Sequence, residues 1–147
     1  MEFLIGAVLA LSVGLSATFI GLDRDRAFYP TVMVVIASHY ALFAVMGGSS
    51  QVLVIESIVI VAFLGASIAG FKRSLWLVVV ALAAHGVFDL VHGHLIENPG
   101  VPPWWSHFCL AYDVVAAVYL AWLLSRSKVH AAATSQQHAA DGASRRR

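Results

Sequence analysis

Long apolar runs alternate with short polar breaks over most of the chain. A transmembrane helix requires about 20 mainly apolar residues, and five segments of the sequence satisfy that requirement. Their expected bounds are 3–22, 28–46, 52–71, 75–95 and 106–125. The pattern therefore predicts an all-α integral membrane bundle of five transmembrane helices, contained in residues 1–126.

The breaks between these runs consist of residues that avoid hydrocarbon or end helices. Residues 23–26 read Asp-Arg-Asp-Arg, whereas residues 47–50 read Gly-Gly-Ser-Ser and favour a tight turn. Residues 97–103 carry prolines and cannot be helical throughout, because proline lacks the backbone N–H donor. The first run is expected to be a retained helix rather than a signal peptide, because Glu2 replaces the basic leader segment and the run is too long for a cleaved apolar region.

The basic residues predict the orientation of the bundle. All nine fall in the first loop, in the third loop or after the last span, so alternating spans place them on one face of the membrane. They are Arg24, Arg26, Lys72, Arg73, Arg126, Lys128 and residues 145–147. Because cytoplasmic loops carry an excess of Lys and Arg, we expect the N-terminus outside and the C-terminus in the cytoplasm. Trp104 and Trp105 fit the outer aromatic belt, and residues 127–147 are predicted to form a disordered cytoplasmic tail.

Composition agrees with a membrane protein and narrows the expected partners. The chain is 60% hydrophobic and 12% charged, against about 45–50% and about 25% in soluble domains. Cys109 is the only cysteine, which excludes a disulfide scaffold, and a net charge of +1 gives no reason to expect nucleic acid. The predicted partners are the lipid bilayer of a cell membrane, a lipid or amphiphile ligand, and a second copy of the chain in a homodimer.

An internal repeat relates two parts of the apolar sequence. Residues 32–48 align without a gap on residues 78–94, and the next span in each copy carries an acid near its outer end. The matched polar residues are His39 with His85 and Glu56 with Asp113. This pattern indicates two hairpins that run in the same direction and pack about an axis along the membrane normal, as parallel repeats do.

Ionisable residues lie inside the spans, where such groups are costly and mark function by default. They are Glu56, Asp89, Asp113, His39, His85 and His92. At a rise of about 1.5 Å per residue, they fall in one layer in the outer half of the membrane. On the fourth span, His85, Asp89 and His92 occupy positions i, i+4 and i+7, so they form one stripe.

This stripe suits a metal ion, because zinc prefers nitrogen and oxygen ligands and keeps an open position where its site is catalytic. We predict that zinc is bound by His85, His92, Asp89, His39 and Glu56. Asp89 and Asp113 are the predicted catalytic residues, each acting as a general base or orienting a ligand. The alternative interpretation is that these side chains only join helices through interhelical hydrogen bonds.

Two motifs and the loop between them resemble a known family. Residues 85–92 form a His-x-x-x-Asp-x-x-His helix, an Asn-Pro loop follows, and residues 109–113 read Cys-x-x-x-Asp. Over residues 75–124 this arrangement resembles a family of small, uncharacterised bacterial multi-pass membrane proteins. The resemblance implies a bacterial inner-membrane protein with a site formed by His85, Asp89, His92, Cys109 and Asp113. A looser similarity in residue types links the chain to intramembrane zinc hydrolases of the alkaline ceramidase type.

Four functions are compatible with these residues. The first is a metal-dependent hydrolase that acts on a lipid or an amphiphile. The second is a proton-coupled transporter or carrier subunit, in which Glu56, Asp89 and Asp113 titrate and the chain forms a homodimer. The third is haem ligation by His39 and His85, and the fourth is a non-catalytic membrane assembly protein.

Overall fold

A computed structural model describes residues 1–126, and these residues form an all-helical bundle without strands. The helices are α1 (Glu2–Ile20), α2 (Phe28–Met46), α3 (Ser50–Lys72), α4 (Trp76–Leu95) and α5 (Trp105–Ser125), with a short 3₁₀ turn at Leu22–Arg24. All five are long and apolar enough to cross a membrane, which supports a multi-pass membrane protein. The five predicted spans are therefore found as helices, whereas the predicted tail at 127–147 lies outside the described residues.

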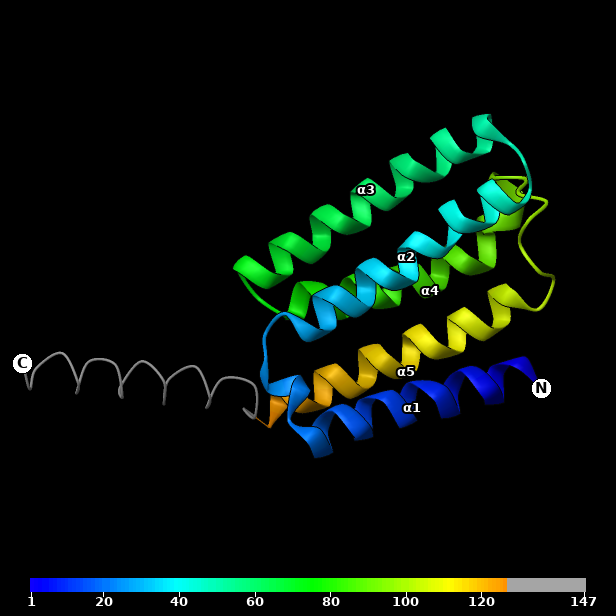
Figure 1. The fold of residues 1–147 in the computed structure, drawn as a ribbon. Helices are drawn as coiled ribbons and strands as arrows, with labels where there is room; N and C mark the ends of the chain where they lie inside the picture. The colour runs from blue at the N-terminus through cyan, green and yellow to red at the C-terminus, as the bar shows by residue number, and fades with distance from the viewer. Residues whose placement is uncertain (127–147) are drawn as a thin grey trace, which may run out of the picture.

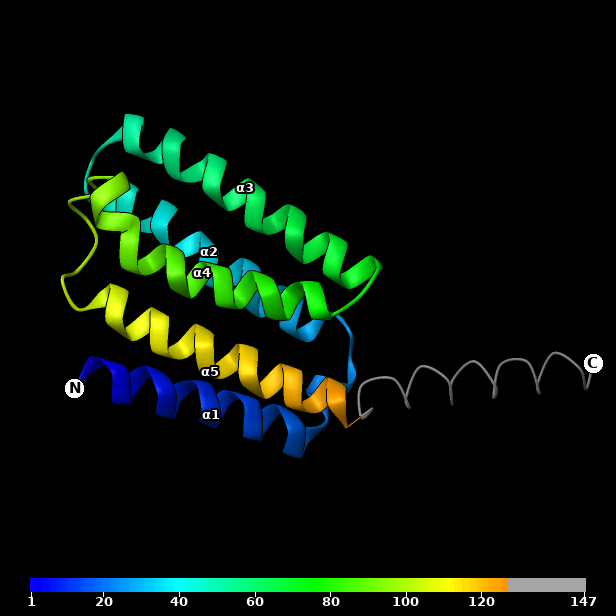
Figure 2. The same cartoon turned by 180° about the vertical axis from the view of Figure 1, so that it is seen from behind.

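The helices lie roughly side by side, with α3 at one edge of the bundle and α1 at the other (Figures 1 and 2). Helix α4 packs against α3, α2 and α5, while α1 packs mainly against α5. The hairpin α2–α3 and the hairpin α4–α5 meet along α4. Helix α4 therefore lies at the centre of the bundle. Its stripe of His85, Asp89 and His92 can contact side chains from the neighbouring helices.

Small residues set the close approach of α1 to α5. The buried face of α1 consists of Gly6, Ala10, Gly14 and Ala17. A Cβ added at Gly6 would lie 2.2 Å from the backbone oxygen of Phe108, so only glycine allows this contact. Small residues at such interfaces let helices approach closely where lipid removes the hydrophobic driving force between them.

The buried interior divides into an apolar half and a polar half along the bundle. The apolar core joins Met33 of α2, Val78 and Leu82 of α4, and Leu120 and Leu123 of α5. Farther along the same helices, toward the α2–α3 and α4–α5 connections, the buried side chains become polar. The apolar half supplies ordinary packing, so the polar half is where a functional role has to be sought.

The two ends of the bundle differ in charge. Arg26 donates a hydrogen bond to the carbonyl oxygen of Phe71 at 2.5 Å and a longer one, 3.3 Å, to that of Gly70, which ties the α1–α2 connection to the end of α3. The connections α1–α2 and α3–α4 lie at one end of the bundle, and the N-terminus lies at the other (Figure 1). The basic residues that precede 127 therefore gather at a single end, as the alternation of spans predicts.

Candidate functional site

The stripe on α4 faces the centre of the bundle. His85, Asp89 and His92 are 1%, 0% and 2% exposed, so all three side chains are sealed from the surroundings. A buried ionisable group is stable only when other groups neutralise or hydrogen-bond it. The stripe therefore has to be understood through its partners on α2, α3, α5 and the α4–α5 loop.

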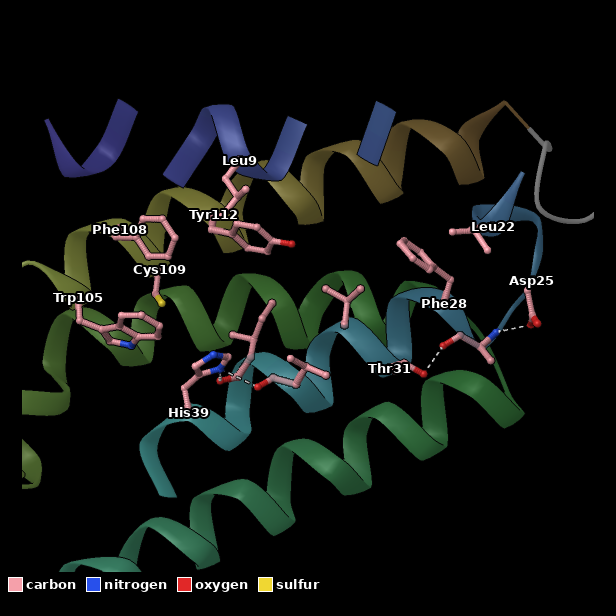
Figure 3. A pocket seen from close by; sticks show the side chains of 14 residues that line it. Leu9, Leu22, Asp25, Phe28, Thr31, His39, Trp105, Phe108, Cys109 and Tyr112 are labelled. Atoms are coloured by element: carbon pink, nitrogen blue, oxygen red, sulfur yellow. Dashed lines mark hydrogen bonds between the residues drawn. The ribbon is translucent and has the colours of Figure 1, made fainter. Parts of the chain in front are cut away.

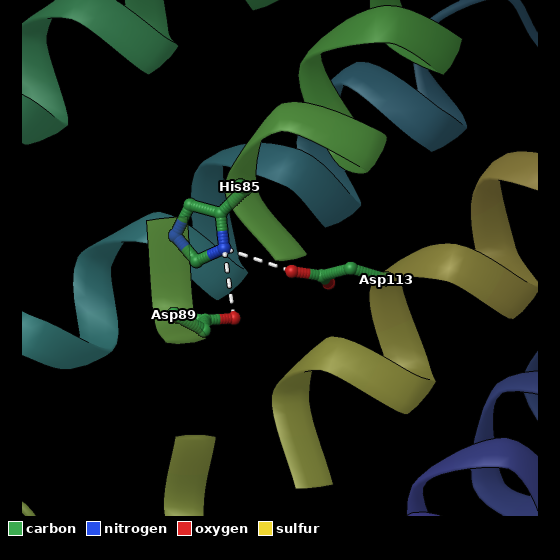
Figure 4. Close-up of side chains that lie close together, drawn as sticks. All are labelled: His85, Asp89 and Asp113. Atoms are coloured by element: carbon green, nitrogen blue, oxygen red, sulfur yellow. Dashed lines mark hydrogen bonds and ion pairs between the residues drawn. The ribbon is translucent and has the colours of Figure 1, made fainter. Parts of the chain in front are cut away.

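His85 lies between two aspartates from different helices. Its Nδ1 atom is 2.8 Å from Oδ2 of Asp113 on α5 and 3.4 Å from Oδ2 of Asp89 one turn along α4. Figure 4 shows the imidazole ring directed at both carboxylates. The shorter contact is a hydrogen bond that Nδ1 donates, while the longer one is an ion-pair contact without hydrogen-bond geometry. His85 thus joins α4 to α5 through Asp113.

These three residues form a group of ligand atoms suited to a metal ion. One atom from each of His85, Asp89 and Asp113 lies within 4.8 Å of the other two, and all three residues are buried. Two carboxylate oxygens, Oδ2 of Asp89 and Oδ1 of Asp113, have no hydrogen-bond partner within residues 1–126. Leaving a buried acceptor unpaired costs about 1–3 kcal/mol, and a cation held between the two carboxylates is a partner that such acceptors lack. The donor set of one imidazole and two carboxylates fits Zn²⁺.

Tyr40 of α2 connects this group to the rest of the polar half. Its hydroxyl donates a hydrogen bond to Oδ1 of Asp89 at 2.5 Å, and its ring stacks on His92 with 3.9 Å between the ring centroids. The sequence interpretation missed Tyr40 because a tyrosine in an apolar span reads as packing. Its spacing from Met33 and Ala37, which are also buried, places it on the inner face of α2 and could have identified it.

A second buried group lies next to the first, around Glu56 of α3. Oε1 of Glu56 is 2.8 Å from Nε2 of His92 and accepts a hydrogen bond from Nδ2 of Asn98 at 2.9 Å. Asn98 also donates to the carbonyl oxygen of Tyr40 at 3.3 Å, and its own Oδ1 accepts from the backbone N–H of Gly100 at 3.2 Å. The α4–α5 loop is thereby fastened over the polar half.

The predicted zinc ligands do not all lie in one group in the structure. His85 and Asp89 share a group with Asp113, whereas His92 pairs with Glu56 and belongs to the second group. These pairs also depart from the internal repeat, in which the counterpart of the His85–Asp113 pair would be His39 with Glu56. Glu56 is instead paired with His92, because His92 lies on the inner face of α4 and His39 does not lie on the inner face of α2.

His39 joins neither group, so the structure does not bring it together with the other predicted ligands of the metal ion. It is only half-buried, and its Nδ1 is 2.8 Å from the carbonyl oxygen of Val35. Its ring packs on Trp105, with 5.2 Å between the centroids, while the ring of His85 packs on Phe63. The two histidines therefore occupy different surroundings, and haem ligation by this pair stays a prediction.

No protein-family model, curated protein or solved structure matches the chain. The predicted resemblance to small bacterial multi-pass membrane proteins is therefore neither supported nor opposed and stays a prediction. The function consequently has to be inferred from the geometry of the two buried groups.

Proposed function

We propose that this protein is a metal-dependent membrane hydrolase whose metal ion is bound by His85, Asp89 and Asp113. The observation that carries the proposal is the convergence of three buried ligand atoms within 4.8 Å of one another. With both carboxylates ionised and the imidazole neutral, as metal ligands must be, the three groups would carry a charge of about −2, which a divalent cation such as Zn²⁺ would balance. Three protein ligands would leave a fourth position free, as in catalytic zinc sites.

The chain's own residues have distinct roles in this proposal. His85, Asp89 and Asp113 would hold the ion, and a bound Zn²⁺ would supply Lewis acidity and make a water molecule more acidic. Asp113 would receive the proton of that water as the predicted general base, whereas Asp89 would bind and orient the ion, because Tyr40 holds its second oxygen. The water oxygen adds to the acyl carbon of an ester or amide, the bond to the leaving oxygen or nitrogen breaks, and the proton passes to that leaving atom.

Tyr40 and the second group position this centre without touching the substrate. The hydrogen bond from Tyr40 fixes one oxygen of Asp89, which leaves the other oxygen for the ion. Partners of this kind orient metal ligands and tune their affinity. Glu56, His92 and Asn98 in turn hold Tyr40 by stacking and by a hydrogen bond to its backbone.

The location of the site also belongs to the proposal. We place the basic end of the bundle in the cytoplasm, because Lys and Arg favour that side, and the N-terminus outside. The polar half then lies in the outer half of a bacterial cell membrane, and the substrate is a lipid or another amphiphile that reaches the site from within the bilayer.

Metal analysis tests the proposal. We expect protein purified in mild detergent without chelators to contain about one zinc ion per chain. His85→Gln and Asp113→Asn should each remove the ion, while His94→Gln should retain it, because His94 lies exposed on the same helix. Metal-free wild-type protein would overturn the proposal, and loss of proton-coupled uptake in Asp89→Asn proteoliposomes would then favour the carrier.

A further inference from the structure

An apolar groove runs along the bundle between α2 on one side and α1 and α5 on the other. Its volume is about 600 Å³, within the range of about 300–1,000 Å³ typical of ligand pockets. Leu9 of α1, Val35 and His39 of α2, and Trp105 and Tyr112 of α5 are among its lining residues. Figure 3 shows Leu9, His39, Trp105 and Tyr112 around a common space.

The groove borders the proposed metal centre through Cys109. This buried side chain lines the groove, and it precedes Asp113 by one helical turn, so the two residues share a face of α5. A molecule in the groove is therefore separated from the centre by one layer of side chains. The groove therefore lies beside the centre, although none of His85, Asp89 and Asp113 is among its lining residues.

The charged residues that line the groove indicate what charge its ligand carries. No lysine or arginine is present among the described residues that line it, and Asp25 is the one acidic residue among them. An anionic head group would find no countercharge there, and burial of an unpaired charge is strongly unfavourable. The groove is therefore complementary to a molecule that has an apolar chain and an uncharged head group.

Two polar atoms near Cys109 define what that head group carries. A carbonyl oxygen only accepts, so Nδ1 of His39 donates to Val35, and in the neutral form of this tautomer Nε2 is an acceptor. Beside it, Nε1 of Trp105 is a buried donor without a partner in the described residues, and the two rings are 5.2 Å apart. A ligand that carries a hydroxyl and an ester or amide carbonyl offers a donor for His39 and an acceptor for Trp105.

We propose that the groove binds a single-chain amphiphile with an uncharged, hydroxyl-bearing ester or amide head group, placed between His39 and Trp105. The apolar chain of this ligand lies along α2 and α1. This inference names the substrate class of the proposed hydrolase and rests on that function for its catalytic consequence. Binding in the groove needs no metal ion, so it can be tested separately.

Photolabelling tests the inference on the full chain in lipid nanodiscs. The probe is a monoacylglycerol with a photoactivatable group on its acyl chain, and mass spectrometry locates the labelled residues. We expect labels on groove-lining residues of α1, α2 and α5. Leu9→Trp should fill the groove and reduce labelling by about tenfold, whereas Leu11→Trp should not, because Leu11 is equally exposed on α1, both being 44% exposed, but lies outside the groove.

A second pair of variants tests the groove independently, in case Leu9→Trp fails to fold. Val35→Trp fills the groove from α2, and Val45→Trp is its control on the lipid-facing side of the same helix. His39→Phe should weaken labelling by about fivefold, as expected for one lost hydrogen bond. The same photolabel on a free fatty acid or on lysophosphatidylcholine should label the groove less than the monoacylglycerol does.

The outcomes separate this inference from the proposed function. Labelling that Leu9→Trp and Val35→Trp leave unchanged, or that is equal for all three probes, overturns the groove as the binding site. The zinc content of the same samples tests separately whether the metal centre binds an ion. Groove labelling in metal-free protein would support the ligand-binding groove and overturn the proposed hydrolase. Bound zinc without groove labelling would support the metal centre and overturn the groove as the binding site.

Discussion

At the scale of single residues, the polar half of the bundle is held together by a few short hydrogen bonds between side chains that are buried from solvent. Tyr40 illustrates this, because its hydroxyl is the hydrogen-bond partner of Asp89 Oδ1. The hydroxyl of Tyr29, eleven residues earlier on the same helix, is buried without a partner in the described residues. The two tyrosines thus differ in what their hydroxyl groups contribute.

Tyr40→Phe and Tyr29→Phe form a matched pair. We expect Tyr40→Phe to lower the free energy of unfolding by about 1–3 kcal/mol, because one oxygen of Asp89 becomes unpaired, and to weaken zinc affinity about 10–100-fold. Tyr29→Phe should be neutral or slightly stabilising, because it removes an unpaired hydroxyl. Unfolding in detergent and competition titration with a zinc chelator measure both quantities, and equal behaviour of the two variants would contradict the role given to Tyr40.

At the scale of elements, the α4–α5 loop acts as a fixed cover over the second buried group. Asn98 bonds to α3 through Glu56 and to α2 through the backbone of Tyr40. Gly100 lies so close to the end of α2 that an added Cβ would clash with the carbonyl oxygen of Phe43. The loop's path is therefore set by one amide side chain and by one position that lacks a side chain.

Gly100→Ala tests how far the site depends on this cover. The new methyl group should push the loop from α2 and break the contacts of Asn98, which exposes Glu56 and His92. We expect faster proteolysis within residues 97–103 and a lower temperature of unfolding. Gly93→Ala is the control, because no atom lies within 4 Å of its added Cβ on α4. Unchanged proteolysis of Gly100→Ala would show that the loop is not held by this contact.

At the scale of the whole molecule, the alternation of spans places the basic residues that precede 127 at one end of the bundle and the polar half nearer the other end. Glu97 lies exposed in the α4–α5 loop, and Ser74 lies in the α3–α4 connection at the basic end. Their positions at opposite ends of the bundle make them reporters of the proposed orientation.

Labelling with a membrane-impermeant maleimide on intact bacterial cells that express the protein checks that orientation. We expect Glu97→Cys to react from outside and Ser74→Cys to react only after the membrane is opened. Native Cys109 is buried, so the wild-type chain provides the unlabelled background. The opposite pattern of labelling would reverse the proposed topology and place the site in the inner half of the membrane.

The sequence by itself determined the five helices, the breaks between them and the inward stripe on α4. These features follow from local chemistry: run length, proline and glycine positions, and the helical period place each of them without knowledge of neighbouring helices. His85, Asp89 and His92 could therefore be assigned to one face before any partner was known.

Only the tertiary structure decided which groups meet. In the structure, His85 forms a hydrogen bond with Asp113, and Glu56 forms one with His92. The ring of His39 packs on Trp105 instead. Tyr40 and Asn98 are further hydrogen-bond partners that the sequence did not indicate. Depth along a span limits which groups can approach, but the rotation of each helix about its axis selects among them. That rotation is set by the packing of whole helix faces, which the pattern of a single span does not contain.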